Sequence, residues 1–319
     1  MKKVKNLSED EIDILSGLKN KKQKQINSKF FYDKKGSVLF DKITNLAEYY
    51  PTKIELEILK KQKKIFTEFL PDSATVVEFG SGSNKKIKNF IKSLKNPRKY
   101  LPVDISKEYL IKNSNEFSKD FPNIEVFPLC ADFVNIRGKN KENIMLQLNK
   151  SKNIVGFFPG STIGNFDPYD AKSLLKSFSN LLKKNNYLVI SIDLLKKKEI
   201  IENAYNDKLG VTARFNLNLL TRLNKEFNAN FILSKFEHLA FFNKKKNRIE
   251  MHLLSNEKQN VRILDETISF KKGETIHTEN SYKYSLQGFQ EVLNQSGFVQ
   301  GKILTDRKKY FAIFLLKVK

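Results

Sequence analysis

The residues with the clearest capacity for chemistry follow three predicted strands. A glycine turn at 80–82 follows the apolar segment 75–79, and Asp104 and the pair Asp132-Phe133 follow two further strand-like segments. Glycine lets the backbone approach a ligand closely, and a helix that starts there offers unpaired N–H groups. A carboxylate after the second strand can accept hydrogen bonds from both ribose hydroxyls. An aromatic ring beside a polar side chain can hold an adenine by its face and its edge. This pattern predicts a site for a nucleotide-type cofactor.

Two cofactors fit such a site. A dinucleotide such as NAD is the main alternative, but the turn GSGSNK at 80–85 lacks the third glycine of the GxGxxG pattern. We therefore expect S-adenosylmethionine rather than NAD.

The elements that must position these residues alternate between strands and helices. Short apolar runs predict buried strands at 75–80, 100–104, 124–133, 153–160 and 187–194, and helical spacing predicts helices at 83–94, 107–119 and 171–184. Continuous apolar strands that alternate with helices indicate a parallel sheet covered on both faces. Right-handed crossovers then give a doubly wound α/β fold.

The alternation stops near residue 195. A helical stretch at 199–228 precedes strand-like segments at 231–242, 248–255 and 259–264, which together predict an α+β unit. From residue 284 the chain reads as one helix and two strands, like the antiparallel edge hairpin of class I methyltransferases. The α+β unit is therefore expected to be an insertion into the sheet domain.

The composition leaves two interpretations of a strong positive charge. The chain of 319 residues carries a net charge of +23, and only seven of its 58 basic residues are arginine. Arginine is the residue that reads bases and clamps phosphates, and these lysines are spread along the chain. We favour a solvated surface over an RNA-binding face and expect no specific nucleic-acid partner.

Localisation follows from what the sequence lacks. No run approaches the roughly 20 apolar residues of a membrane helix. The first 18 residues lack the apolar core of a secretory signal, and Cys130 is the single cysteine. We expect a cytoplasmic protein, without a membrane partner and monomeric. Cys130 lies in a strand pattern and is expected to be buried and structural.

One segment of the chain is too particular to be generic. FFYDKKGSVLFDKITNLAEYYPTKIE at 30–55 resembles the signature of the histidine-specific methyltransferases of ergothioneine biosynthesis. The resemblance continues, in the same order, through VVEFGSGSNKK, YLPVDIS, FFPGSTIGNFDP, NAYNDKLGVTARFNLNLLTRLNKE, RIEM and HTENSYKYS.

The resemblance implies a fold, a division into domains and an activity. The implied fold is α/β, a class I (Rossmann-like) methyltransferase sheet with an inserted α+β substrate-binding domain. Residues 55–194 and 283–319 would form the methyltransferase domain, and residues 1–54 and 195–282 the substrate-binding domain. The implied activity is S-adenosylmethionine-dependent Nα-methylation of free L-histidine, in three successive transfers that give Nα,Nα,Nα-trimethylhistidine.

The resemblance also implies the roles of individual residues. Contacts with S-adenosylmethionine fall on Gly80, Lys86, Asp104, Asp132 and Phe133. Contacts with histidine fall on Asn165 and Tyr205 for the carboxylate, on Glu279 and Ser281 for the imidazole, and on Tyr49 and Met251. Tyr32 is expected to relay the proton of the amine, with Phe40 beside it.

Most of these residues also have an ordinary structural interpretation. Tyr49 and Tyr205 can be half-buried packing tyrosines, Glu279 a solvated acid, and Met251 core filler. The three histidines stand at unrelated spacings without an acid or cysteine cluster, so we expect no metal site. The competing functions are methylation of another amino acid or an indole amine by the same family, and methylation of RNA. Absence of an Asn-Pro-Pro-Tyr signature after the fourth strand argues against RNA base methylation.

Overall fold

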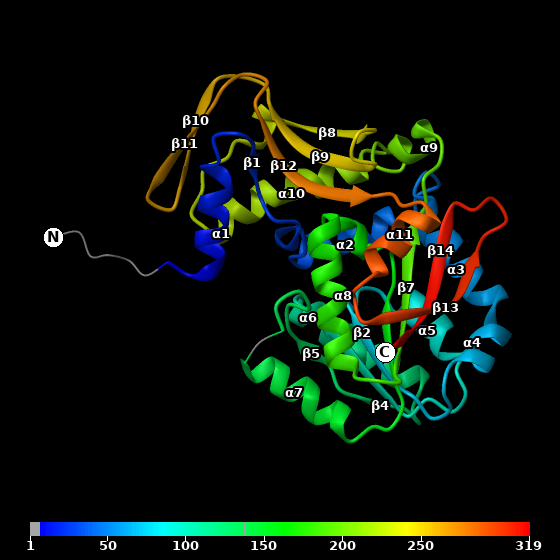
Figure 1. The fold of residues 1–319 in the computed structure, drawn as a ribbon. Coiled ribbons are helices and arrows are strands. Elements are labelled where there is room, and N and C mark those ends of the chain that lie inside the picture. Colours follow the sequence, from blue (N-terminus) through cyan, green and yellow to red (C-terminus); the bar gives the residue numbers. More distant parts are fainter. Residues whose placement is uncertain (1–6, 137) are drawn as a thin grey trace. The chain divides into compact units, whose positions relative to one another are not determined.

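A computed structural model describes residues 7–136 and 138–319, which divide into two compact units. Unit 1 contains the chain up to Ile43 and Lys198–Asn280, and unit 2 contains Thr44–Lys197 and Ser281–Lys319. Unit 2 is therefore interrupted by an insertion, and it also holds residues 44–54 (Figure 1). Assignment of substrate binding to one of the units stays a prediction.

Unit 2 is built on one mixed sheet. Its strands are β2 (Thr75–Phe79), β3 (Lys99–Asp104), β4 (Glu125–Val126), β5 (Leu129–Cys130), β6 (Ile154–Phe158), β7 (Tyr187–Asp193), β13 (Phe298–Thr305) and β14 (Phe311–Val318). The strand order is β13-β14-β7-β6-β2-β3-β4, with β5 also paired to β3. Strands β2 to β7 pair in parallel, while β14 lies antiparallel to β7 and to β13. The predicted parallel sheet and its closing hairpin are confirmed.

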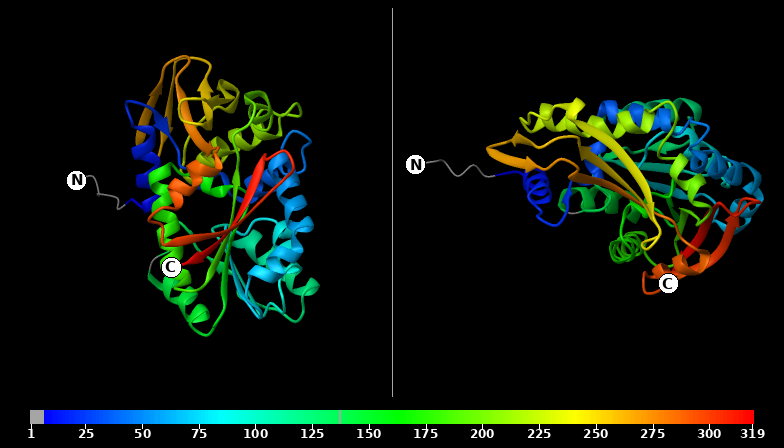
Figure 2. Two further views of the ribbon diagram at one scale, coloured as in Figure 1. Left: turned by 45° about the vertical axis from the view of Figure 1, so that its right-hand side comes forward. Right: turned by 90° about the horizontal axis from the view of Figure 1, so that it is seen from above.

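Helices cover both faces of this sheet (Figure 2). They are α3 (Tyr50–Lys61), α4 (Lys63–Phe69), α5 (Asn84–Ile91), α6 (Lys107–Asp120), α7 (Gly138–Asn149), α8 (Pro168–Leu182) and α11 (Leu286–Leu293). Because side chains alternate along a strand, Val77 and Phe79 of β2 pack toward α7, α8 and α11, while Val76 packs toward α3, α4 and α5. The continuous apolar strands are thus buried on both sides, as a doubly wound fold requires.

Unit 1 has an α+β structure with its own sheet. A four-stranded sheet has the order β1-β12-β9-β8, and β10 and β11 form a hairpin of their own. The strands are β1 (Lys24–Gln25), β8 (Phe236–Asn243), β9 (Arg248–Ser255), β10 (Gln259–Ile263), β11 (Glu266–Phe270) and β12 (Thr275–Tyr282). The helices are α1 (Glu9–Leu18), η1 (Ser28–Phe31), α2 (Lys34–Ile43), α9 (Lys198–Asn203), α10 (Val211–Glu226) and η3 (Leu233–Lys235). The boundary between the units falls within β12, after Asn280.

The structure departs from the expected elements in three places. The single strand expected at 124–133 is divided into β4 and β5, because Pro128 has no N–H to donate to a ladder. The helical stretch expected at 199–228 is interrupted between α9 and α10 by the non-helical residues 204–210, the last of which is Gly210 with φ +63°. Cys130 was expected to be buried, and this was wrong: it is exposed, since β5 pairs over only two residues.

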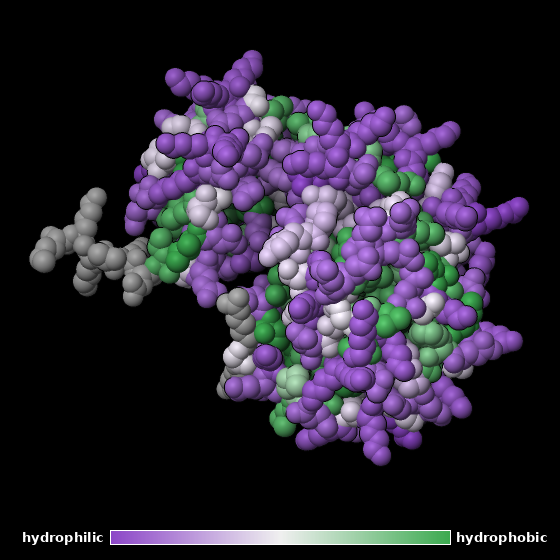
Figure 3. Space-filling view, in the orientation of Figure 1, coloured by the Kyte–Doolittle hydropathy of each residue, from purple (hydrophilic) through white to green (hydrophobic). Residues whose placement is uncertain are grey.

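One face of the protein is strongly hydrophilic. Hydrophilic side chains spread over most of the face shown in Figure 3, with smaller apolar areas between them. Within the described residues, no helix combines the length and the apolar character needed to cross a bilayer.

Candidate functional site

The predicted cofactor residues meet at the carboxyl ends of neighbouring strands in unit 2. Gly80 follows β2, Asp104 ends β3, and Asp132 and Phe133 follow β5. Strands β2 and β5 both pair with β3 in parallel, so these four residues lie at one edge of the sheet. Open parallel sheets bind their ligands at this edge.

The glycine turn is shaped by its contact with Phe133. Gly80 has φ +75°, and a Cβ atom there would lie 3.3 Å from the Phe133 ring. Next to it, a Cβ on Gly82 would meet only open space. The Phe133 ring packs edge-on against Phe158, with centroids 5.4 Å apart. The turn therefore brings open backbone at Gly82 and the Phe133 ring to the same edge of the sheet, a combination that suits an adenosine group.

Asp104 carries a carboxylate suited to hydroxyl groups. Its Oδ1 accepts a hydrogen bond from the Ser106 backbone N–H at 2.8 Å. Burial raises the pKa of Asp104 to about 6, against the opposing effect of backbone hydrogen bonds from Ser106 and Ile105. A desolvated carboxylate gains most from a ligand that donates hydrogen bonds, as a ribose does.

A second buried acid, to which the sequence pattern assigned no role, lies beside this edge. Glu78 of β2 is fully buried and accepts a hydrogen bond from the Tyr100 hydroxyl, which in turn lies 3.0 Å from Ser81 Oγ. Burial raises the pKa of Glu78 to about 7, opposed by hydrogen bonds from Tyr100 and Ser81. The sequence did contain a signal for Glu78, because it is an acidic residue within an otherwise apolar strand segment. The network fixes Ser81 within the glycine turn.

Lys86, another predicted cofactor residue, is held by Glu55, a buried acid to which the sequence pattern assigned no role. Lys86 Nζ lies 2.7 Å from Glu55 Oε2, and the Glu55 side chain has no exposed surface. The same carboxylate accepts the Gly160 N–H at 2.9 Å. Glu55 thus ties α3 to α5 and to the turn after β6.

The turn after β6 carries Asn165, a predicted contact for a carboxylate. The turn is a short 3-10 helix, η2 (Thr162–Asn165), preceded by Ser161 in the left-handed region at φ 57°. A Cβ on Gly164 would lie 2.9 Å from the Tyr282 carbonyl oxygen. The Asn165 turn therefore packs against the backbone next to Ser281, a predicted contact for a ring.

A buried cluster of charged residues lies near Asn165 and Ser281. Asp193, at the end of β7, lies 2.9 Å from Lys283 Nζ and also pairs with Lys196. Tyr50 donates a hydrogen bond to the same carboxylate at 2.6 Å. Burial alone raises the pKa of Asp193, but the two lysines and Tyr50 hold that pKa below its ordinary value. Tyr49, the predicted substrate contact, is the buried residue just before α3.

Unit 1 contains three of the predicted aromatic residues, Tyr32, Phe40 and Tyr205. The Tyr32 and Phe40 rings meet edge to face at 5.8 Å, and both lie about the Phe215 ring of α10. Tyr205 is buried, and its carbonyl oxygen lies 2.9 Å from His238 Nε2. Tyr32 and Phe40 are therefore together, while Tyr205 and Asn165 belong to different units.

The remaining predicted contacts lie on strands of unit 1 and at its boundary. Met251 of β9 is 1% exposed, as expected of core filler as much as of a pocket wall. Glu279 of β12 is half-buried, and the neighbouring Thr278 hydroxyl bonds Asn216 Oδ1 at 2.8 Å. Ser281 is buried and belongs to unit 2. The roles of all three stay predictions.

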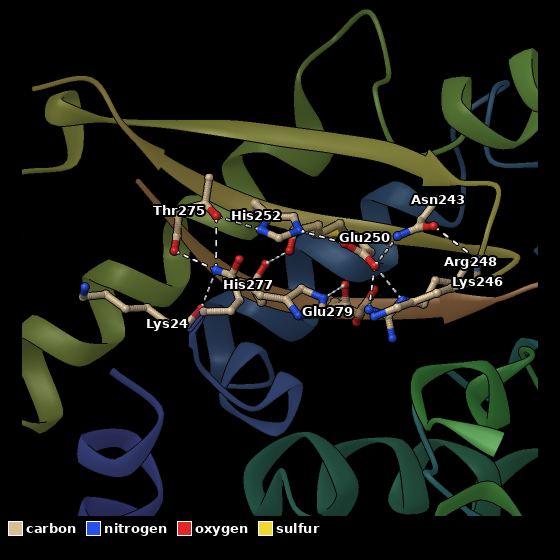
Figure 4. Close-up of polar contacts among 12 residues, drawn as sticks. Lys24, Asn243, Lys246, Arg248, Glu250, His252, Thr275, His277 and Glu279 are labelled. Carbon is tan, nitrogen blue, oxygen red and sulfur yellow. Dashed lines mark hydrogen bonds and ion pairs between the residues drawn. The ribbon is translucent and has the colours of Figure 1, made fainter. Parts of the chain in front are cut away.

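The pairing of β9 with β12 produces one cluster that residue spacing did not suggest (Figure 4). Glu250, His252 and His277 offer ligand atoms that all lie within 4.8 Å of one another. Burial lowers the pKa of His277 to about 4, helped by the charge of His252. These are metal-binding residue types, and the expectation that no acid lies near the histidines was wrong.

A positive charge already occupies this cluster. The Arg248 guanidinium lies 2.5 Å from Glu250 Oε1, and His252 Nε2 lies 3.4 Å from Glu250 Oε2. The His252 and His277 rings are stacked nearly parallel, with centroids 4.7 Å apart. We interpret the cluster as a hydrogen-bonded network. The absence of a metal site stays a prediction.

Comparison with known proteins identifies relatives of this chain. The chain is 33% identical to the histidine N-alpha-methyltransferase of Mycobacterium tuberculosis, over 95% of this chain and 93% of that one. It is 34% identical to the enzyme of the same name from Mycolicibacterium smegmatis, with the same coverage. It is 24% identical to the 4-dimethylallyltryptophan N-methyltransferase of Claviceps purpurea, over 96% of this chain and 94% of that one.

The family model described as histidine-specific, S-adenosylmethionine-dependent methyltransferase matches residues 10–318. The cofactor and the class I methyltransferase fold that the sequence predicted are thereby confirmed. The chain belongs to the histidine-specific, S-adenosylmethionine-dependent methyltransferase family.

Proposed function

We propose that this enzyme methylates the α-amino group of free L-histidine three times, giving Nα,Nα,Nα-trimethylhistidine in the ergothioneine pathway of the cytoplasm. The observation that carries the proposal is the 33–34% identity, along 95% of the chain, to two histidine N-alpha-methyltransferases. The packing of the Asn165 turn against the backbone beside Ser281 supports it, because a free amino acid offers both a carboxylate and a side chain.

S-adenosylmethionine supplies an electrophilic methyl group on a sulfonium. Gly80, Asp104, Asp132 and Phe133 are the residues we propose to hold it, with Lys86 fixed nearby by Glu55. The glycine turn leaves backbone open to the ligand, and the Asp104 carboxylate accepts hydrogen bonds from the ribose.

The amine must lose a proton before it can attack, since an α-amine with a pKa of roughly 8 is mostly protonated at pH 7. Tyr32 is half-exposed and lies edge to face with Phe40. We assign to Tyr32 a hydrogen bond to the amine and relay of its proton to water. The aromatic rings of Tyr32 and Phe40 then stabilise each methylated ammonium by cation–π contact, at about 0.5–2 kcal/mol.

Histidine selection is assigned to Asn165 and Tyr205 for the carboxylate and to Glu279 and Ser281 for the imidazole. Tyr49 and Met251 are further proposed contacts of the substrate. A second candidate substrate is an indole amine, which the similarity to the 4-dimethylallyltryptophan N-methyltransferase favours at lower identity.

The test is a substrate panel read by mass spectrometry. The purified protein and S-adenosylmethionine are offered free histidine, tryptophan, dimethylallyltryptophan or total RNA. We expect mass increases of one, two and three methyl groups on histidine and none on RNA. Methylation of an indole amine with no reaction on histidine would overturn the histidine assignment while leaving the family intact.

A further inference from the structure

The Ser281 hydroxyl receives a hydrogen bond from a lysine within the buried core of unit 2. Ser281 lies near the end of β12, and Lys283 is the first residue after that strand. Lys283 Nζ lies 2.8 Å from Ser281 Oγ. Both residues are buried, with 4% and 2% of their surfaces exposed. Water therefore competes little with this contact.

The ammonium group fixes the direction of this hydrogen bond. Lysine is a donor only, so the Ser281 oxygen must accept, and its own hydrogen is directed to another acceptor. Lys283 is also ion-paired with Asp193 at 2.9 Å, which holds the ammonium in place. A serine hydroxyl has one hydrogen to donate and two lone pairs; with one lone pair taken by Lys283, its hydrogen is directed away from the ammonium.

We propose that Lys283 is a positioning residue that makes Ser281 a hydrogen-bond donor toward the unprotonated ring nitrogen of the substrate. This inference rests on the proposed function, in which Glu279 and Ser281 flank the imidazole. Glu279 accepts the ring N–H and Ser281 donates to the other nitrogen, so the pair selects neutral imidazole in one tautomer. The same arrangement disfavours imidazolium, whose two nitrogens both donate.

Asp193 extends this role to the second predicted contact in unit 2. The Ser161 hydroxyl accepts the Asp193 backbone N–H at 2.8 Å, and Ser161 begins the turn that ends in Asn165. Asp193 thus connects the support of Ser281 with the support of Asn165. Its carboxylate also keeps Tyr50 and Lys196 as partners, so removal of Lys283 does not leave that carboxylate unpaired.

A double-mutant cycle tests the proposal. Lys283→Met, Ser281→Ala and the double variant are compared with wild type for kcat and KM on histidine. We expect each single change to lower kcat/KM about tenfold, mainly through KM, as for loss of one hydrogen bond. Because Lys283 acts through Ser281, the double variant should lose about tenfold as well, rather than about a hundredfold.

Lys283→Gln is the matched control, because its amide still offers N–H donors to Ser281. It should recover part of the activity that Lys283→Met loses. Calorimetric affinity for S-adenosylmethionine and the melting temperature report whether each variant is folded. If Lys283→Met does not fold, the comparison of Lys283→Gln with and without Ser281→Ala supplies the same cycle.

The outcomes separate the two proposals. Multiplicative losses in the double variant, with wild-type turnover of histidine, would overturn the role of Lys283 alone. A wild type that binds S-adenosylmethionine but does not methylate histidine would overturn the proposed function, and the inference with it.

Discussion

At the scale of single residues, the Asp104 carboxylate combines a cost in stability with a role in binding. Its pKa is raised to about 6 by burial. Between pH 4 and pH 6 the unfolded chain loses this proton and the folded protein keeps it, so the free energy of unfolding falls as pH rises through that window. Above pH 6 the loss is constant. A bound ligand that donates hydrogen bonds to the carboxylate offsets this loss in the free energy of unfolding.

Asp104→Asn should therefore stabilise the ligand-free protein while weakening cofactor binding. At pH 7 we expect a gain of about 1–3 kcal/mol in unfolding free energy, and no gain at pH 4. Affinity for S-adenosylmethionine should fall at least tenfold, because a charged acceptor is lost. Denaturant titrations from pH 4 to 8 and calorimetry measure the two effects. Asp120→Asn, at an exposed acid paired with Lys88, is the control. Unchanged cofactor affinity in Asp104→Asn would remove Asp104 from the site.

Glu279 is the residue on which the histidine assignment depends. An imidazole N–H facing this carboxylate forms a charge-assisted hydrogen bond, and an apolar side chain would leave the acid unpaired. We expect Glu279→Ala to reduce kcat/KM for histidine and to relax selection against phenylalanine and tryptophan, with cofactor affinity retained. Methylation of the three amino acids by wild type and variant provides the measurement. Wild-type histidine kinetics in the variant would make Glu279 an ordinary strand acid.

At the scale of elements, the sequence predicted what local pattern encodes. Apolar runs identified β2, β3, β6 and β7, and the glycine turn and Asp104 followed from where those runs end. What it could not predict depends on pairing between distant segments. The Glu250, His252 and His277 cluster exists because β9 pairs with β12, and no spacing within the chain contains that information. Glu55 was missed for the same reason, since its partners Lys86 and Gly160 come from other elements.

The Glu55 contact predicts how three elements depend on one side chain. Glu55→Ala leaves the mostly buried Lys86 ammonium and the Gly160 N–H without their acceptor, and breaking a buried pair from one side costs about 3–5 kcal/mol. Glu57 lies on the exposed face of α3 and pairs with Lys61 one turn away. Glu57→Ala should therefore lower the free energy of unfolding by less than about 1 kcal/mol. Urea denaturation compares the two variants. Equal losses would show that Glu55 contributes no more than a surface acid.

At the scale of the whole molecule, a change in the sequence pattern predicted the insertion of unit 1 into unit 2. Regular alternation of strand and helix stops near residue 195 and returns near 284, and the units of the structure exchange at Lys198 and Ser281. The identity of the substrate could not be predicted from such a pattern, because substrate selection depends on a few side chains that come from separate elements. It came from the resemblance, which the similarity to histidine N-alpha-methyltransferases supports.

The net charge of +23 belongs to the whole molecule and suggests the last prediction. The basic residues are mostly lysines, and the face in Figure 3 carries hydrophilic side chains broadly rather than in one stripe. We expect any RNA binding to be non-specific and to weaken steeply between 50 mM and 200 mM salt, since it depends on counterion release. Nuclease-treated protein should methylate histidine at an unchanged rate. Mobility-shift titrations with two unrelated RNA sequences, together with the methylation assay, measure both effects. Tight binding to only one of those sequences at 200 mM salt would instead identify a dedicated RNA surface, and the charge would then require a function beyond solvation.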